Sequence, residues 1–347
     1  MARDTGDGDT PRRTRKRPNS YDVAKLAGVS QSAVSRVFQP GASASDDMRA
    51  RVLKAAKELG YRPNAIARGL ITQRSDMVAV LISVQTNLYY PEVLVQLTRR
   101  FSDHGVRVLL FALDHEGDID STLEQVLQYR VDGLVTAAML SPAQLAMVES
   151  ADIPVVLFNR TLADVPVNSV RCDQEEGEAW LVQQLVDAGH QRFAIVAGPD
   201  DSAVSVERTA GAIRKLEELG ISQFDVVKGD YSYDSGRRGF AELMARPERP
   251  DAVIATNDAM AIGVMDEART AFGLRIPDDL SVVGFDGIRP GRFDEYALTT
   301  VRQPLVRMTD AAVSMLLDRI DKPDLAPEKR VFSGERLSGR SARLGPA

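Results

Sequence analysis

The chain has 347 residues, 44% of them hydrophobic, and a net charge of −6, which allows two or three domains with ordinary cores. Its single cysteine, Cys172, excludes an internal disulfide framework. The sequence shows neither an apolar run of the roughly 18 residues that span a bilayer nor a secretory signal, so we expect a cytoplasmic protein without membrane contact.

The charge is unevenly divided along the chain. Residues 1–76 carry a net +7, and the remaining residues carry −13. A basic segment joined to an acidic body indicates that the first part meets a polyanion and the second does not.

Residues 1–18 are polar, rich in arginine and without apolar periodicity, and we predict a disordered basic tail. The cluster from Arg12 to Arg17 is either a solvated segment or a contact for phosphates. It precedes the first helical pattern of the chain.

Residues 19–63 have the spacing of three short helices. We predict a first helix, Tyr21 to Ala27, capped by Ser20, with Val23, Ala24, Leu26 and Ala27 facing inward. Ser30 should cap a second helix and Ser45 a third, which Gly60 ends. This pattern predicts a small three-helix recognition unit.

The second helix has an outer face of hydrogen-bonding side chains, namely Gln31, Ser32, Ser35 and Arg36. Such a face is either an ordinary solvent-exposed surface or a surface that reads base edges. A helix held across a short glycine turn suits the major groove of DNA, where glutamine pairs with adenine and arginine with guanine. The surrounding positive charge favours DNA.

After Met77 the sequence alternates apolar strands with amphipathic helices, which predicts parallel sheets covered on both faces. About ten strands suggest two sheets, hence two α/β lobes. We expect the first lobe at about 77–172 plus 303–328 and the second at about 173–302 plus 329–340. Two such lobes leave a crevice between them, and small ligands bind in crevices of this kind, at the carboxyl ends of the strands.

Four polar residues are our candidates for contacts in that crevice: Arg208, Asn257, Asp258 and Asp286. Three of them close apolar strands, and Arg208 is expected to begin a helix. A guanidinium with carboxylates and an amide suits sugar hydroxyls, and Arg208 alternatively clamps a carboxylate. Asp258 is equally a candidate for a helix cap.

The sequence lacks the patterns of catalytic and cofactor sites. It has no G-x-G-x-x-G, no P-loop, no G-x-S-x-G and no histidines at metal-ligand spacing. We therefore expect no catalytic residues, no metal and no cofactor.

Several motifs together resemble the LacI/GalR family of bacterial transcription regulators. The stretches YDVAKLAGVSQSAVSRVF and MRARVLKAAKELGYRPNAIARGL resemble the family's N-terminal signature. VNSVRCDQEEG, DAGHQRFAIVAGP, ATNDAMAIGVMDEA, IPDDLSVVGFDG and LTTVRQP resemble landmarks of its body, in family order. The resemblance implies a helix-turn-helix domain at 19–63, a hinge helix with its linker at 64–75, and a two-lobed body of the type I periplasmic-binding-protein fold at 76–347 that binds an effector and dimerises.

The resemblance also implies roles for individual residues. It assigns base reading to Gln31, Ser32 and Arg36, and backbone contacts to Tyr21, Ser30, Ser35 and Ser45. It places Asn64, Arg68 and Leu70 in the hinge helix at the minor groove, with Leu70 as an apolar wedge or, alternatively, packed against the body. To the effector contacts it adds Asn87, Tyr89, Asn159 and Gln303.

These observations predict a homodimeric, nucleoid-associated repressor that binds double-stranded operator DNA. We expect a small effector to control it, and the resemblance implies that this effector is a sugar or sugar acid. The C-terminal LSGRSARLGPA lacks leucine heptads, so we expect no tetramer. A transport solute-binding protein is one alternative, but it leaves residues 20–75 without a role. An enzyme on a doubly wound fold is another, and the missing motifs count against it.

Overall fold

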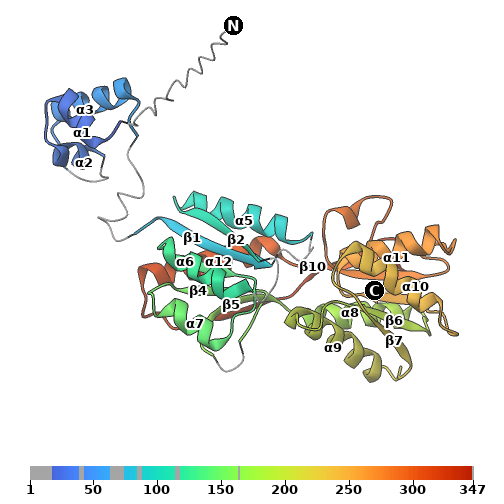
Figure 1. Cartoon of the computed structure of the whole chain (residues 1–347). Helices are drawn as coiled ribbons and strands as arrows, with labels where there is room; N and C mark the ends of the chain where they lie inside the picture. Colours follow the sequence, from blue (N-terminus) through green and yellow to red (C-terminus); the bar gives the residue numbers. More distant parts are fainter. Residues whose placement is uncertain are drawn as a thin grey trace, which may run out of the picture. The chain divides into compact units, whose positions relative to one another are not determined.

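A computed structural model describes residues 18–38, 43–62, 74–83, 88–113, 118–162 and 165–345 (Figure 1). Four of the predicted site residues lie outside these ranges: Asn64, Arg68, Leu70 and Asn87. So does the predicted basic tail, apart from its last residue. The chain divides into two compact units, Met1–Ser75 and Asp76–Ala347.

The first unit is a three-helix bundle of α1 (Ser20–Ala27), α2 (Gln31–Val37) and α3 (Asp46–Leu59). Val23, Val34 and Val52, one from each helix, are fully buried and form its centre. Since a unit this small buries little apolar surface, the end caps matter to its stability.

Two of the three predicted caps are confirmed. Ser30 accepts from the amide of Ala33, and Ser45 from that of Met48. Ser20 as the first cap is wrong, because Asn19 caps α1 and forms a reciprocal capping box with Asp22.

The prediction that Leu26 faces inward is also wrong. Its side chain is 47% exposed, while Val23, Ala24 and Ala27 are buried. Residues 23 and 27 lie one turn apart and define the buried face, and Leu26 is rotated about 100° from residue 27.

The second unit contains two six-stranded sheets. The first sheet is entirely parallel, in the order β11-β5-β4-β3-β1-β2. Its strands are β1 (Met77–Ser83), β2 (Arg107–Leu113), β3 (Gly133–Thr136), β4 (Val155–Phe158), β5 (Asn168–Cys172) and β11 (Lys329–Phe332). Its helices are α5 (Tyr90–Asp103), α6 (Ile119–Gln128), α7 (Pro142–Glu149) and α12 (Leu305–Asp321).

The second sheet has the order β12-β10-β9-β8-β6-β7 and is parallel except for β12, which runs antiparallel to β10. Its strands are β6 (Phe193–Ala197), β7 (Phe224–Lys228), β8 (Ala252–Ala255), β9 (Ser281–Asp286), β10 (Thr299–Arg302) and β12 (Glu335–Leu337). Its helices are α8 (Gln174–Asp187), α9 (Ala203–Glu218), α10 (Tyr233–Met244) and α11 (Asp258–Thr270).

Both faces of each sheet are covered, as the apolar strands predict. In β1 the residues Val78 and Val80 belong to one apolar cluster and Ala79 and Leu81 to another, and all four are buried. A strand buried on both sides must be apolar without alternation. Figure 1 shows the two sheets with their helices as two lobes.

The chain passes between the sheets three times: from β5 to α8, from β10 to α12, and from β11 to β12. The assignment of 329–340 to the second lobe is wrong for β11, because Lys329–Phe332 pair in parallel with residues 169–172 of β5. The return crossing therefore falls between Phe332 and Glu335. Within the described ranges, no helix is long and apolar enough to cross a membrane.

Candidate functional site

Helix α2 presents the polar face that the sequence predicts. Ser32 and Arg36 are exposed, and Gln31 and Ser35 are half-buried. The Gln31 side-chain amide donates to Ser35 Oγ at 3.2 Å and lies 3.4 Å from Ser20 Oγ. Within the described residues, the Arg36 side chain makes no hydrogen bond or ion pair, which leaves its guanidinium available to a ligand outside the unit.

The residues expected to contact the DNA backbone are also accessible. Tyr21 is 70% exposed, and the caps Ser30 and Ser45 are exposed. Each cap uses its hydroxyl oxygen as an acceptor for a backbone amide. Because a hydroxyl also carries a donor, capping is compatible with donation to a phosphate.

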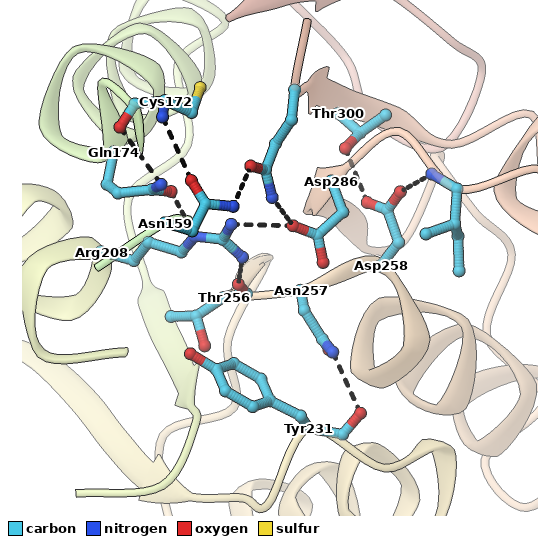
Figure 2. A network of polar contacts seen from close by, with 12 residues as sticks. Asn159, Cys172, Gln174, Arg208, Tyr231, Thr256, Asn257, Asp258, Asp286 and Thr300 are labelled. Carbon is cyan, nitrogen blue, oxygen red and sulfur yellow. Dashed lines mark hydrogen bonds and ion pairs between the residues drawn. The ribbon is translucent and has the colours of Figure 1, made fainter. Parts of the chain in front are cut away.

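In the second unit, six residues form a closed ring of hydrogen bonds, the polar ring, drawn in Figure 2. Its members are Asn159, Cys172, Gln174, Arg208, Asp286 and Gln303. Four of them, Asn159, Arg208, Asp286 and Gln303, are predicted effector contacts.

One half of the polar ring runs through amide side chains. The backbone N–H of Cys172 donates to Asn159 Oδ1 at 3.2 Å, and Asn159 Nδ2 donates to Gln303 Oε1 at 2.6 Å. Gln303 Nε2 in turn donates to Asp286 Oδ1 at 2.7 Å.

The other half runs through Arg208. Its Nη2 donates to Asp286 Oδ1 at 2.7 Å, and its Nε donates to Gln174 Oε1 at 2.8 Å. Gln174 Nε2 donates to the carbonyl oxygen of Cys172 at 3.2 Å, and this bond closes the ring.

The polar ring joins the two lobes at their crossings. Asn159 follows β4 and Cys172 ends β5, so both belong to the first sheet, whereas Asp286 ends β9 of the second. Gln303 directly follows β10 at the second crossing, and Gln174 is the first residue of α8, where the first crossing ends. A change in the angle between the lobes must therefore change bonds of this ring.

The Arg208–Asp286 pair is the electrostatic centre of the ring. Both side chains are at most 2% exposed, Arg208 Nη1 donates to the carbonyl of Thr256 at 2.7 Å, and the guanidinium lies 3.9 Å from the centre of the Phe285 ring. Burial, the largest single influence, opposes the charged form, but the charge and hydrogen bond of Asp286 together with neighbouring acidic groups outweigh it, so the pKa of Arg208 is raised. The second oxygen of Asp286 is buried without a hydrogen bond from the described residues.

Glu178 lies one turn after Gln174 on α8 and is fully buried. Neither carboxylate oxygen has a hydrogen-bond partner among the described residues. Burial, reinforced by Asp286 and opposed by Arg208, raises the pKa of Glu178 to about 8. Glu178 is therefore a neutral acid at pH 7.

Two residues of the ring have left-handed backbone conformations. Asn159 has a φ of 53° and Asp286 a φ of 116°. Non-glycine residues with such angles cost about 1–3 kcal/mol each and concentrate at functional sites. The strain therefore agrees with a binding role for this ring.

Asn257 and Asp258 lie outside the ring. Asn257 caps α11 by accepting from Met260 at 2.9 Å and donates to the Tyr231 carbonyl at 3.0 Å. Asp258 accepts from Ile288 at 2.8 Å and Thr300 at 2.6 Å, and its burial raises its pKa to about 8. Asp258 as a helix cap is wrong, because the preceding Asn257 takes that position.

A cavity of about 510 Å³ adjoins the polar ring. Three predicted contacts, Tyr89, Asp286 and Gln303, line it, together with the start of α12 and the segment after β9.

Gln174 is not among the site residues that the sequence predicts, although it lies in the quoted motif VNSVRCDQEEG. The expectation that Arg208 begins a helix is wrong, since α9 begins at Ala203.

Two family models match the chain. The model described as bacterial regulatory proteins, lacI family, matches residues 21–64, and the one described as a periplasmic binding protein-like domain matches residues 182–342. They correspond to the three-helix unit and to a large part of the two-sheet body.

Among curated proteins, the chain is similar to the HTH-type transcriptional regulator AscG of Escherichia coli K12. The identity is 32% over 336 residues, covering 94% of this chain and 98% of AscG. It is also similar to the ribose operon repressor of the same strain, with 32% identity over 315 residues, 89% of this chain and 94% of that protein.

Among solved structures, the chain resembles the Lac repressor dimer bound to operator and the anti-inducer ONPF. The TM-score is 0.85 at 28% identity, covering 94% of this chain and 99% of that one. It also resembles the CelR–cellobiose complex, with a TM-score of 0.71 at 30% identity, 94% of this chain and 100% of that one.

These relatives match the helix-turn-helix unit and the two-lobed body together. The predicted fold class is therefore confirmed, and the alternatives of an enzyme and a transport protein are rejected. The chain belongs to the LacI family of bacterial transcription regulators.

Proposed function

We propose that this regulator is a homodimeric repressor that binds a near-palindromic operator and is controlled by a small effector, a sugar or sugar derivative, bound between the lobes of its body. The polar ring is the observation that carries the proposal. It links both lobes at two crossings and contains a buried ion pair in which one carboxylate oxygen accepts no hydrogen bond from the described residues.

For the DNA half, α2 reads base edges in the major groove through Gln31, Ser32 and Arg36. Tyr21, Ser30, Ser35 and Ser45 contact the backbone and set the register. The hinge residues Asn64, Arg68 and Leu70 enter this proposal from the family resemblance alone, with Leu70 as a minor-groove wedge at a central C·G step. Operator DNA as partner puts the protein at the nucleoid, in the cytoplasm.

For the effector half, the Asp286 oxygen that has no hydrogen bond from the described residues accepts from a ligand hydroxyl, and Asn159, Arg208, Gln303 and Tyr89 supply the further contacts. Asn87 is included by resemblance. Asn257 and Asp258 hold the neighbouring loops that shape the site. The relatives named for the ribose operon and for a complex with cellobiose support a sugar.

Coupling between the halves follows from linkage. An effector that binds one lobe arrangement more tightly shifts the population toward it, and a few kcal/mol of differential affinity are enough. Operator binding must then change effector affinity by the same factor.

A thermal-shift screen of sugars and sugar acids, followed by operator binding with each hit, tests the proposal. We expect a dimer in sedimentation, DNA binding that falls steeply with salt because counterions are released, and at least one sugar that changes it. A monomer that ignores DNA at low salt would overturn the proposal.

A further inference from the structure

Arg208 is not available to clamp an anion. It already donates to Asp286, Gln174 and the Thr256 carbonyl from a fully buried position. A charged ligand group at this site therefore needs another cation.

The cavity beside the polar ring supplies such cations. Arg289 and Arg292, in the segment after β9, line it and are exposed. In the described part of the chain, neither side chain forms a hydrogen bond or an ion pair. Arg307 joins them from the first turn of α12, where its guanidinium lies 5.0 Å from the centre of the Phe332 ring.

The start of α12 adds to this positive potential. Leu305, Val306 and Arg307 line the cavity, and the N-cap Pro304 provides no side-chain cap. The Leu305 N–H donates to the Gln303 carbonyl at 2.7 Å, so it is the following amides and the dipole of α12 that favour an anion at this end. The helix terminus and the three arginines line the same cavity.

The acids of the cavity do not cancel this charge. Asp286 faces Arg208, and Glu335 is paired with Arg302 at 3.2 Å. Glu92, which is exposed on α5, is the third carboxylate of the lining. When the paired side chains are set aside, the cavity lining holds three arginines and one carboxylate.

We propose that Arg289, Arg292 and Arg307, with the amino end of α12, bind the phosphate group of a phosphorylated sugar whose hydroxyls reach Asp286 and Gln303. This inference rests on the proposed function and specifies its effector class. Three cations and a helix terminus match a dianion, and about 510 Å³ lies in the usual range for small-ligand sites.

The test uses the full chain and inorganic phosphate as probe, titrated by calorimetry at constant ionic strength against chloride. The variants are Arg289→Gln/Arg292→Gln and Arg307→Gln. Arg249→Gln is the matched control, since Arg249 is an exposed arginine outside the cavity lining. Because the DNA-binding unit also attracts phosphate, the difference in phosphate affinity between the variants, and not the affinity of the wild type alone, tests the cavity.

We expect phosphate binding to weaken at least tenfold in the double variant and clearly in Arg307→Gln, with the control unchanged. Glucose 6-phosphate and ribose 5-phosphate should each bind more tightly than the corresponding free sugar. Equal phosphate affinity in the wild type and the double variant would overturn the inference.

Low-salt DNA binding by the same proteins separates the two proposals. Retained DNA binding without a phosphate effect rejects only the effector class. If the wild-type protein does not bind DNA at low salt, the proposed function itself is rejected.

Discussion

Replacing Arg208 by methionine tests how much the buried ion pair at the centre of the polar ring stabilises the body. The substitution keeps an unbranched side chain but removes the partner of Asp286, whose side chain is 1% exposed. It also releases the carbonyl of Thr256 and the amide of Gln174. Leaving one charge of a buried pair without its partner costs about 3–5 kcal/mol.

An exposed pair of the same lobe gives the matched control. Arg214 lies 2.6 Å from Glu175, but the two side chains are 56% and 48% exposed. Exposed pairs contribute about 0–1 kcal/mol, so Arg214→Met should cost less than about 1 kcal/mol. The two substitutions are chemically identical and differ in burial.

Urea unfolding followed by tryptophan fluorescence measures both changes. The only tryptophan, Trp180, lies on α8, so the signal reports the second unit. The double variant Arg208→Met/Asp286→Asn should recover at least about 1 kcal/mol, because the unpaired charge is removed. A cost for Arg208→Met no larger than for Arg214→Met, or no recovery in the double variant, would refute the reasoning.

Three further predictions concern single side chains. Arg36→Ala should weaken operator binding by about 1–3 kcal/mol and relax the preference at one base pair; binding-site selection measures this, and an unchanged preference contradicts it. Ser30→Ala should destabilise the first unit by about 1 kcal/mol in a circular dichroism melt. Ser32→Ala removes only the 2.9 Å hydrogen bond to the Ser30 hydroxyl and leaves the capping acceptor in place, so its cost should stay within about 0.5 kcal/mol. The folded state keeps Glu178 protonated up to about pH 8, above its ordinary pKa of 4.5, so stability should fall as pH rises through that interval. Glu178→Gln should reduce the slope, and identical slopes would contradict the assignment.

The helices and strands were predictable because their patterns are strong. The runs MVAVLIS and FAIVA are apolar without alternation, as strands buried on both faces must be. Helix ends were less certain, since neighbouring residues compete for the cap. Asn19 and Ser20 both suit that position, and only the reciprocal bond with Asp22 selects Asn19.

The candidate site was predictable in part. Residue type indicates Arg208 and Asp286, and the end of an apolar strand further supports Asp286. The resemblance indicates Asn159 and Gln303, and the structure brings these four together. The backbone of Cys172 contributes two bonds of the ring, and a backbone group leaves no signal in the sequence. The position of Asn257 and Asp258 outside the polar ring depends on distant partners such as Tyr231 and Thr300.

The polar ring also limits which ligands can act as effectors. A ligand whose contacts are the same in both lobe arrangements gives no differential affinity, however well it fills the cavity. A ligand that bonds to Asp286 Oδ1 or Gln303 Oε1 competes with Arg208 or Asn159, which couples binding to the ring, whereas one that bonds only to the second oxygen of Asp286 displaces no partner. Because an unpaired buried charge is costly, such a ligand must replace the partners it displaces, so its polar groups and not its volume determine whether it switches the protein.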